Sequence, residues 1–317
     1  VLKTLKQNVI GQDSAIDAVV RGLLVPMAGM SRGNRPLRSY LFCGPTGVGK
    51  TETASVLSKC LAKEDVNLVR IDMSEFSEHH EAAKLFGAPP GYVGYESGGI
   101  LTSAVIENPQ SIILLDEIEK AHPQVLTTLL QLLDEGILRD ENNREISFRD
   151  TIVIATSNAG ADRIREYIER GYQLEQFEQT FINELINANL FRPEFLNRFD
   201  EIVLFRPLGK EELLQVVDLI LAGVNKTLAP QKIQVAVEEE GKKLLVEAGY
   251  DPRLGARPMR RVVQRAVENT IAKQMLAGLI AAGSTATITA QQISQVLDAS
   301  EVSQPAPLPS DVQDFGT

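Results

Sequence analysis

Residues 36–51, PLRSYLFCGPTGVGKT, decide the fold. The apolar run 40–43 predicts a short buried strand, and it leads directly into GPTGVGKT, which fits the pattern G-x-x-x-x-G-K-[ST]. Helical spacing follows over residues 52–61. A strand, a glycine-rich loop and a helix in this order hold phosphate groups, because loop N–H groups and the positive end of the helix dipole converge on one anion. The sequence therefore predicts a nucleotide site.

The loop and the two residues after it have separate expected roles. The loop residues expected to contact ATP are Gly44, Pro45, Thr46, Gly47, Val48 and Gly49. Lys50 is expected to reach the β- and γ-phosphates during catalysis, and the Thr51 hydroxyl to bind Mg²⁺. The alternative is a glycine-rich turn that happens to end in Lys-Thr, and the flanking strand and helix argue against it.

Composition limits the class of protein. The 317 residues are enough for two domains, and 44% hydrophobic with 23% charged residues is ordinary for a globular protein. The net charge of −10 argues against sequence-independent binding of nucleic acid, and we find no apolar run of membrane length. Without a signal peptide, a cytoplasmic protein with no membrane partner is expected. Its two thiols, Cys43 and Cys60, are expected to be reduced and to pack in the interior.

Apolar runs alternate with helical spacing along the first two thirds of the chain. Further strands are predicted at 67–72, 111–117, 151–156 and 201–205, and helices at 77–86, 99–107, 119–135 and 160–189. Residues 136–149 are expected to form a hairpin. Alternating strands and helices favour an α/β fold, with a parallel sheet sandwiched by helices.

The pattern changes near Leu208. We expect residues 1–208 to form a large α/β nucleotide-binding domain and residues 209–300 a small, mainly α-helical lid domain. In the lid, helices are predicted at 211–228, 237–248 and 258–282, with a small strand at 285–289 and a weak helix to about residue 299. Residues 301–317 lack periodicity, and a disordered tail is expected there.

Two acids end the apolar run 111–117. A nucleotide site needs a metal-binding acid on a neighbouring strand, and Asp116 is expected to hold Mg²⁺, directly or through water. Glu117 is expected to polarise the attacking water as a general base. The alternative is a solvated strand end, or a charge pair at the start of the next helix.

These motifs together resemble an AAA+ ATPase, and more narrowly the second ATPase module of the Clp unfoldases, over about residues 5–290. The segments that carry the resemblance are VIGQ (9–12) on the adenine side, the pore loop GAPPGYVG (87–94), the metal-binding strand LLDEIEKAHP (114–123), the sensor-1 segment TSN (156–158), the arginine-finger segment FRPEFLNR (191–198) and the sensor-2 segment GYDPRLGARPMRR (249–261). Six such motifs in this order make the resemblance specific.

The resemblance implies roles for residues that spacing alone does not assign. Val9 and Ile10 would contact the nucleotide, and Arg257 would reach it from a helix N-terminus. Asn158 would position the attacking water, although a turn-capping asparagine is the alternative. Arg198 would act in trans on the γ-phosphate of a neighbouring subunit. Its alternative is an ion pair with Asp200 or Glu201.

Tyr92 and Val93 stand between glycines in the predicted pore loop. An aromatic side chain on a glycine-hinged loop can press on any extended chain, so these two residues are the expected substrate grip, with a tyrosine packed under its own loop as the alternative. A second pore loop is expected at 140–144, where DENNR lacks the family's usual glycine. Metal binding by His79 and His80 is not expected, since adjacent helical side chains point about 100° apart.

The resemblance implies a motor that uses ATP and Mg²⁺ and assembles with itself into a ring, expected to be a hexamer. Its substrates would be unfolded or aggregated polypeptides threaded through the pore. Residues 159–190 lack the docking tripeptide of Clp subunits that partner a peptidase. This favours a ClpB-like disaggregase over the ATPase subunit of a Clp-type protease. A remodeller of another macromolecular complex is the remaining alternative.

Overall fold

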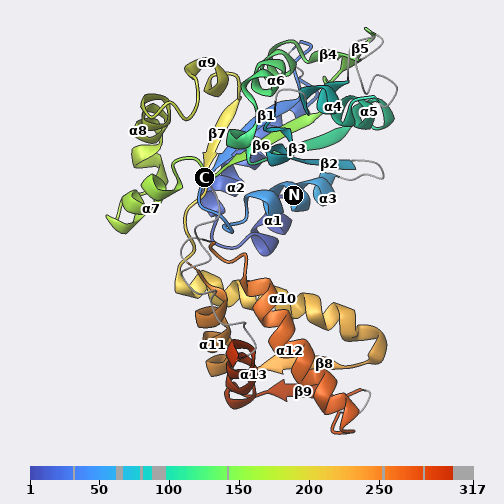
Figure 1. The fold of residues 1–317 in the computed structure, drawn as a ribbon, viewed down its shortest axis with the longest axis vertical. Helices are drawn as coiled ribbons and strands as arrows, with labels where there is room; N and C mark the ends of the chain where they lie inside the picture. Colours follow the sequence, from blue (N-terminus) through green and yellow to red (C-terminus); the bar gives the residue numbers. More distant parts are fainter. Residues whose placement is uncertain are drawn as a thin grey trace, which may run out of the picture. The chain divides into compact units, whose positions relative to one another are not determined.

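The computed structural model describes residues 1–30, 33–61, 67–78, 81–87, 98–140, 143–251, 254–280 and 283–302. The chain forms two compact units, Val1–Gly209 and Lys210–Thr317 (Figure 1). The tail expected at 301–317 lies outside the described residues, apart from the last two residues of the final helix.

A five-stranded parallel sheet forms the centre of the first unit, in the order β2-β3-β6-β1-β7. Its strands are β1 (Arg38–Cys43), β2 (Asn67–Asp72), β3 (Ser111–Asp116), β6 (Ile152–Ser157) and β7 (Glu201–Leu204). Every residue of β3 and β6 is buried. Such continuous apolar strands require cover on both faces, as parallel sheets have. The predicted α/β fold with a parallel sheet is confirmed.

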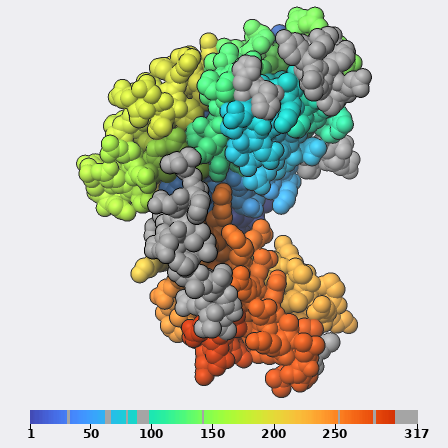
Figure 2. Space-filling model, viewed as in Figure 1, coloured from blue at the N-terminus to red at the C-terminus, as the bar shows by residue number. Residues whose placement is uncertain are grey.

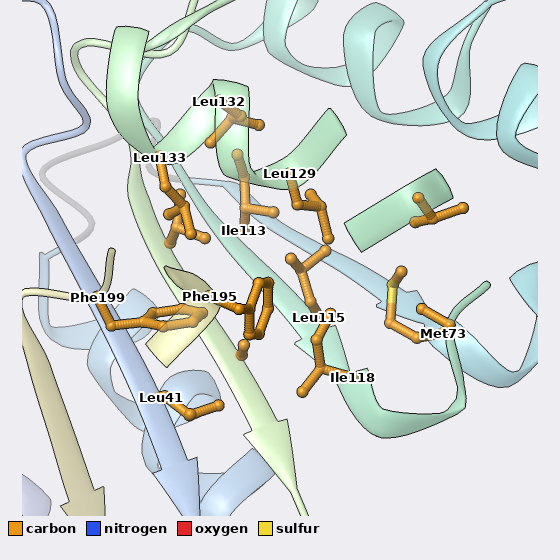
Figure 3. Close-up of a cluster of buried hydrophobic side chains, with 14 of the residues drawn as sticks. Leu41, Met73, Ile113, Leu115, Ile118, Leu129, Leu132, Leu133, Phe195 and Phe199 are labelled. Carbon is orange, nitrogen blue, oxygen red and sulfur yellow. The ribbon is translucent and has the colours of Figure 1, made fainter. Parts of the chain in front are cut away.

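Helices cover both faces of this sheet (Figure 1). On one face lie α1 (Leu2–Asn8), α2 (Asp13–Met27) and α3 (Lys50–Leu61), packed on strand residues such as Phe42 and Leu114. The core of the other face involves α4 (Ala82–Phe86), α5 (Ile100–Glu107), α6 (Pro123–Glu135), α7 (Ala161–Glu169), α8 (Leu174–Asn187) and α9 (Pro193–Leu196). Figure 3 shows Ile113 and Leu115 of β3 in this second core, beside Leu129 of α6 and Phe195 of α9.

Three predicted helices of the first unit are shorter or divided in the structure. The helix expected at 119–135 is a 3₁₀ turn, η4 (Ile118–Lys120), followed by α6, because Pro123 favours the first position of a helix and His122 caps it. The helix expected at 160–189 is split into α7 and α8 around Gly171, which has a φ of 87°. Helices α7 to α9 form the surface at one side of this unit (Figure 2). In the described part of the helix expected at 77–86, the α-helix is α4, and a 3₁₀ turn, η1 (Met73–Phe76), comes before this range.

The predicted hairpin is present as β4 (Ile137–Arg139) and β5 (Glu145–Ser147), paired antiparallel. At its base, Gly136 ends α6 with a left-handed φ of 63°. An added Cβ there would lie 1.7 Å from the carbonyl oxygen of Asn34. Gly136 therefore meets two demands at once, a backbone turn and a close approach of the loop that precedes β1.

The second unit is mainly helical. It contains α10 (Lys210–Leu228), η5 (Ala229–Gln231), β8 (Gln234–Val237), α11 (Glu239–Gly249), α12 (Met259–Leu276), β9 (Thr285–Ile288) and α13 (Ala290–Val302). β8 and β9 pair in parallel, and β8 was not predicted. Its alternating side chains bury only Val235 and Val237, too short a pattern to be recognised without its partner strand.

Among the described residues, one helix, Lys210–Gln231, is long and apolar enough by length and composition to cross a membrane. These two properties alone are weak grounds for a membrane span. The buried side chains of this helix include Leu213, Val217 and Leu221, and the helix packs on α11 and α12. One face of this helix therefore packs within its own unit.

Replacing Gly136 with alanine should lower the free energy of unfolding of the first unit by about 2–4 kcal/mol, because strain of the left-handed backbone adds to the clash with Asn34. Urea denaturation measures this loss. Gly171→Ala is the matched control, since its φ is also positive but nothing lies within 4 Å of the added Cβ. It should cost about 1 kcal/mol. Equal losses in the two variants would contradict the role given to the close approach.

Candidate active site

The carboxyl ends of β1, β3 and β6 meet at one edge of the sheet. The parallel register places Cys43 opposite Ser157, and Leu115 opposite Ala155. The loop after β1, the acid at the end of β3 and the residue after β6 are therefore neighbours. In open α/β sheets, ligands bind at this edge.

The glycines of the phosphate loop have different tasks. Gly47 and Gly49 have φ values of 73° and 106°, which glycine adopts without strain. At Gly44, an added Cβ would lie 2.6 Å from the carbonyl oxygen of Phe205, so this position needs glycine for close packing. Val9 also lies against the loop, because its side chain is 3.1 Å from where a Cβ on Gly49 would be. Val9 was expected on the nucleotide side, and the structure brings it to the loop.

The side chain of Lys50 is buried inside the loop that it follows. Its Nζ donates hydrogen bonds to the carbonyl oxygens of Gly44 at 2.6 Å and Pro45 at 2.7 Å. It also donates to Oδ1 of Asn158 at 2.9 Å, and the same oxygen accepts from the Thr46 hydroxyl at 3.3 Å. Lys50 and Asn158, which were predicted as site residues with separate roles and are 108 residues apart, are thus in direct contact.

Asp116 is buried, with 5% of its surface exposed. Its Oδ1 accepts hydrogen bonds from the hydroxyls of Thr51 and Thr156, each at 3.0 Å. Its Oδ2 forms an ion pair with Arg70, at 2.7 Å from Nη2. A buried carboxylate needs such partners, because an unpaired charge is costly away from water. The contact between Thr51 and Asp116 joins the two residues that were predicted to bind Mg²⁺.

Glu117 has a left-handed backbone, with φ of 56° and ψ of 52°. Such a conformation costs a residue other than glycine about 1–3 kcal/mol, and it is found most often at functional sites. The Glu117 N–H donates to the Thr156 hydroxyl at 3.2 Å, which holds the turn. Within the described part of the chain, its half-buried carboxylate has no hydrogen bond or ion pair. It is therefore available to accept a proton.

Two residues of the site were missed as individual contributors. Glu119 Oε1 accepts a hydrogen bond from the N–H of Asn158 at 3.0 Å, while its Oε2 is buried without a partner among the described residues. Thr156 links Asp116 to the turn at Glu117. Both lie inside predicted motifs, but only the register of β3 against β6 shows what they contact.

Gln12 ties the segment 9–12 to the site. Its side chain is buried, and Nε2 donates to the carbonyl oxygens of Val48 at 3.1 Å and Arg206 at 2.9 Å. In return, the N–H of Arg206 donates to Oε1 of Gln12 at 3.1 Å. One amide side chain therefore fixes the phosphate loop to the chain after β7, beside the segment that contains Val9 and Ile10.

Arg198 lies at the other end of the sheet. Asp200, two residues on, exchanges hydrogen bonds with Ser39 at the amino end of β1. The guanidinium of Arg198 pairs with Asp134 at the end of α6, 2.6 Å from its Oδ1. Arg198 thus forms an ion pair within its own chain, as the alternative expected, but with Asp134 and not with Asp200 or Glu201. Those acids are adjacent in sequence but bind Ser39 and Arg38 instead.

The remaining predicted positions are only partly described. Arg257 is exposed in the second unit, two residues before α12, and its contact with nucleotide stays a prediction. Tyr92, Val93, His79 and His80 lie outside the described residues. No group of three or more His, Cys, Asp or Glu side chains suited to a metal ion occurs in the described ranges.

Both cysteines are free thiols. Cys43 is fully buried at the end of β1, and this burial raises the pKa of its thiol to about 12, against a smaller opposing effect of Lys50. The thiol is thus neutral near pH 7 and packs as an apolar group. Cys60 is only partly buried, less than predicted.

A phosphate loop that opens a helix, with a buried lysine and an acid at the end of a nearby strand, defines a P-loop nucleoside triphosphatase. The acid was predicted on a neighbouring strand, but β6 lies between β1 and β3 in the sheet. Comparison with known families narrows this class. Residues 35–202 match the family described as "AAA domain (Cdc48 subfamily)", and the chain belongs to this AAA family. Residues 208–288 match the "C-terminal, D2-small domain, of ClpB protein". The predicted resemblance to a Clp-type AAA+ ATPase module is confirmed.

Individual relatives agree with the family match. "Chaperone protein ClpB" of Meiothermus ruber is 49% identical over 279 residues, covering 88% of this chain and 32% of the relative. "ATP-dependent Clp protease ATP-binding subunit ClpE" of Streptococcus pneumoniae serotype 4 is 48% identical over 267 residues, covering 84% of this chain and 35% of the relative. The chain thus spans about a third of the length of these relatives.

Replacing Glu119 with alanine should release the backbone of Asn158 and misplace its side chain. Amide hydrogen exchange at Asn158 should become faster, and ATP turnover should fall by about 10–100-fold, because small displacements of positioning groups are costly. Glu119→Gln keeps an oxygen acceptor and should remain close to wild type in both measurements. Unchanged exchange at Asn158 in Glu119→Ala would show that this hydrogen bond does not hold the segment.

Proposed function

We propose that this chain is the ATP-hydrolysing motor module of a protein unfoldase or disaggregase, which threads polypeptide through the pore of a ring. The observation that carries the proposal is the meeting of Lys50, Thr51, Asp116, Glu117 and Asn158 at one sheet edge. The match to a ClpB domain and to relatives named as chaperones supports protein unfolding or disaggregation as the work that ATP hydrolysis drives.

The residues present fit Mg²⁺ with ATP. Thr51 and Asp116 offer two oxygen donors in contact, which is the ligand chemistry that this hard cation prefers. When bound, the ion would neutralise charge on the phosphate oxygens. Binding of the phosphates would require Lys50 to exchange its loop carbonyl contacts for phosphate oxygens, while α3 presents its N-terminal N–H groups to them.

The catalytic work falls to the side chains around the loop. Glu117 would take the proton of the attacking water, and its strained turn holds the carboxylate at the end of β3. Asn158 would orient the water from the adjacent strand, with its backbone fixed by Glu119. Val9, Ile10 and Arg257 would complete the nucleotide site.

Arg198 would complete the site of a neighbouring subunit. From Ser39, beside Arg198, to Gly44 is five residues of strand, or roughly 16 Å. An arginine side chain does not extend that far, so Arg198 is not available to the phosphate loop of its own chain. This separation supports a finger that acts in trans, which is typically worth about 10³–10⁵ in rate.

A ring follows from a shared site, and we propose a homo-hexamer. Its substrates would be unfolded or aggregated polypeptides gripped by Tyr92 and Val93. The net charge of −10 supports a partner other than nucleic acid, and composition supports a cytoplasmic location without a membrane partner. A second candidate is the ATPase subunit of a Clp-type protease, which the ClpE relative favours. The missing docking tripeptide in residues 159–190 favours the disaggregase.

Mixing two inactive variants tests the shared site. Glu117→Gln and Arg198→Ala should each lower ATP turnover by about 10²-fold or more. In an equal mixture, roughly a quarter of the interfaces join an intact Glu117 to an intact Arg198, so activity should return in part. Glu117→Gln mixed with Lys50→Ala is the control. Both changes damage the same half of the site, so this mixture should stay inactive. Mixed rings without recovery would disprove the trans role.

Unfolding of a folded reporter protein tests the output. Tyr92→Ala should keep ATP turnover near the wild-type rate but lose reporter unfolding, because the grip is removed while the nucleotide site is intact. Tyr172→Ala removes another exposed aromatic, 48% exposed between α7 and α8, and should keep both activities. Unfolding that survives in Tyr92→Ala would refute the pore-loop assignment.

A further inference from the structure

Arg70 contacts the buried acid of the site from the edge strand β2. Its Nε lies 2.8 Å and its Nη2 2.7 Å from Oδ2 of Asp116. The two side chains differ in exposure, with 60% for Arg70 and 7% for Asp116. Neither composition nor motif spacing assigned Arg70 a role.

The sheet register explains how this pair forms. Arg70 lies opposite Leu114, and Asp72 lies opposite Asp116. Leu114 and Asp116 are two residues apart and therefore lie on the same face of β3, the face that packs on α3. Arg70 is at the rim of this face, so its long side chain reaches along the edge to the end of β3.

The two oxygens of Asp116 have separate partners. Oδ1 accepts hydrogen bonds from the hydroxyls of Thr51 and Thr156, at 3.0 Å each. The Nε and Nη2 atoms of Arg70 both contact Oδ2. Thr51 lies in the first turn of α3, the helix that follows the phosphate loop, so Oδ1 is the oxygen on the phosphate side. The guanidinium is on the far side of the same carboxylate.

We propose that Arg70 is a positioning residue, which fixes the Asp116 carboxylate so that Oδ1 faces the Mg²⁺ of bound nucleotide. This inference rests on the proposed Mg²⁺ and nucleotide site. A planar fork that holds one oxygen restricts rotation of the carboxylate. Since Oδ2 alone is used, Arg70 keeps its contact when Oδ1 serves the metal.

A competing role for Arg70 predicts the opposite change in Mg²⁺ affinity when the arginine is removed. If Arg70 merely neutralised Asp116 until the metal displaced it, removal of Arg70 would strengthen Mg²⁺ binding. If Arg70 positions the carboxylate, removal weakens it. The Mg²⁺ requirement of nucleotide binding therefore separates the two roles without any measurement of hydrolysis.

The test is a titration with Mg²⁺ of the binding of a fluorescent ADP analogue. In Arg70→Met, the Mg²⁺ concentration at half-saturation should rise by about 10–100-fold, the usual effect of losing an orienting partner of a metal ligand. In Arg70→Lys this concentration should rise by less, because the lysine ammonium keeps the positive charge but not the planar pair of donors. Arg163→Met is the control. Its side chain is also 60% exposed, and it pairs with Glu166 on α7.

Each outcome decides between the roles. A raised Mg²⁺ concentration at half-saturation in Arg70→Met, with the wild-type concentration in Arg163→Met, supports the positioning role of Arg70. If the Mg²⁺ concentration at half-saturation is unchanged or lowered in Arg70→Met, the positioning role is overturned. If Arg70→Met does not fold by circular dichroism, Arg70→Lys decides, and a wild-type value there overturns the inference. Wild type that binds no nucleotide, or binds without Mg²⁺ dependence, would instead refute the proposed site itself.

Discussion

The buried carboxylate of Asp116 is the interaction on which the rest of the site depends. It ends a strand that is buried on both faces, and 5% of its surface is exposed. A charge in that place is tolerated only when it is paired and hydrogen-bonded. Its partners come from α3, β6 and β2, so the helix after the phosphate loop and both neighbouring strands are tied to one side chain.

Lys50 is a second buried ionisable side chain of the site, a base where Asp116 is an acid, and it needs partners for the same reason. Its ammonium is buried under the loop, where two carbonyl oxygens and Asn158 accept its hydrogen bonds. These partners satisfy the hydrogen-bonding needs of the buried amine before phosphate is present. The loop therefore has a defined conformation in the structure, and binding of phosphate becomes an exchange of acceptors around a fixed cation.

Local patterns were sufficient where a residue's environment follows from its neighbours in sequence. The phosphate loop, the apolar strands and the acids of β3 are of this kind. Helix boundaries failed where one residue such as Pro123 or Gly171 interrupts a periodic run. Arg70 and β8 could not be found, because their role depends on a partner strand whose register the sequence does not state. The pairing of Arg198 with Asp134 likewise depends on where α6 ends.

β1 connects the phosphate loop of its own nucleotide site to the segment of Arg198, which is proposed to serve the site of another subunit. Its carboxyl end leads into the phosphate loop, and Ser39 at its amino end holds Asp200 beside Arg198. Apart from Arg38 at its start, the strand is buried, and the sheet clamps it between β6 and β7. The phosphate loop and the segment that holds Arg198 are therefore joined by one short, buried strand. If Arg198 serves a neighbour, this single strand is the shortest connection through the chain between the nucleotide site of one subunit and the site that its arginine completes in the next.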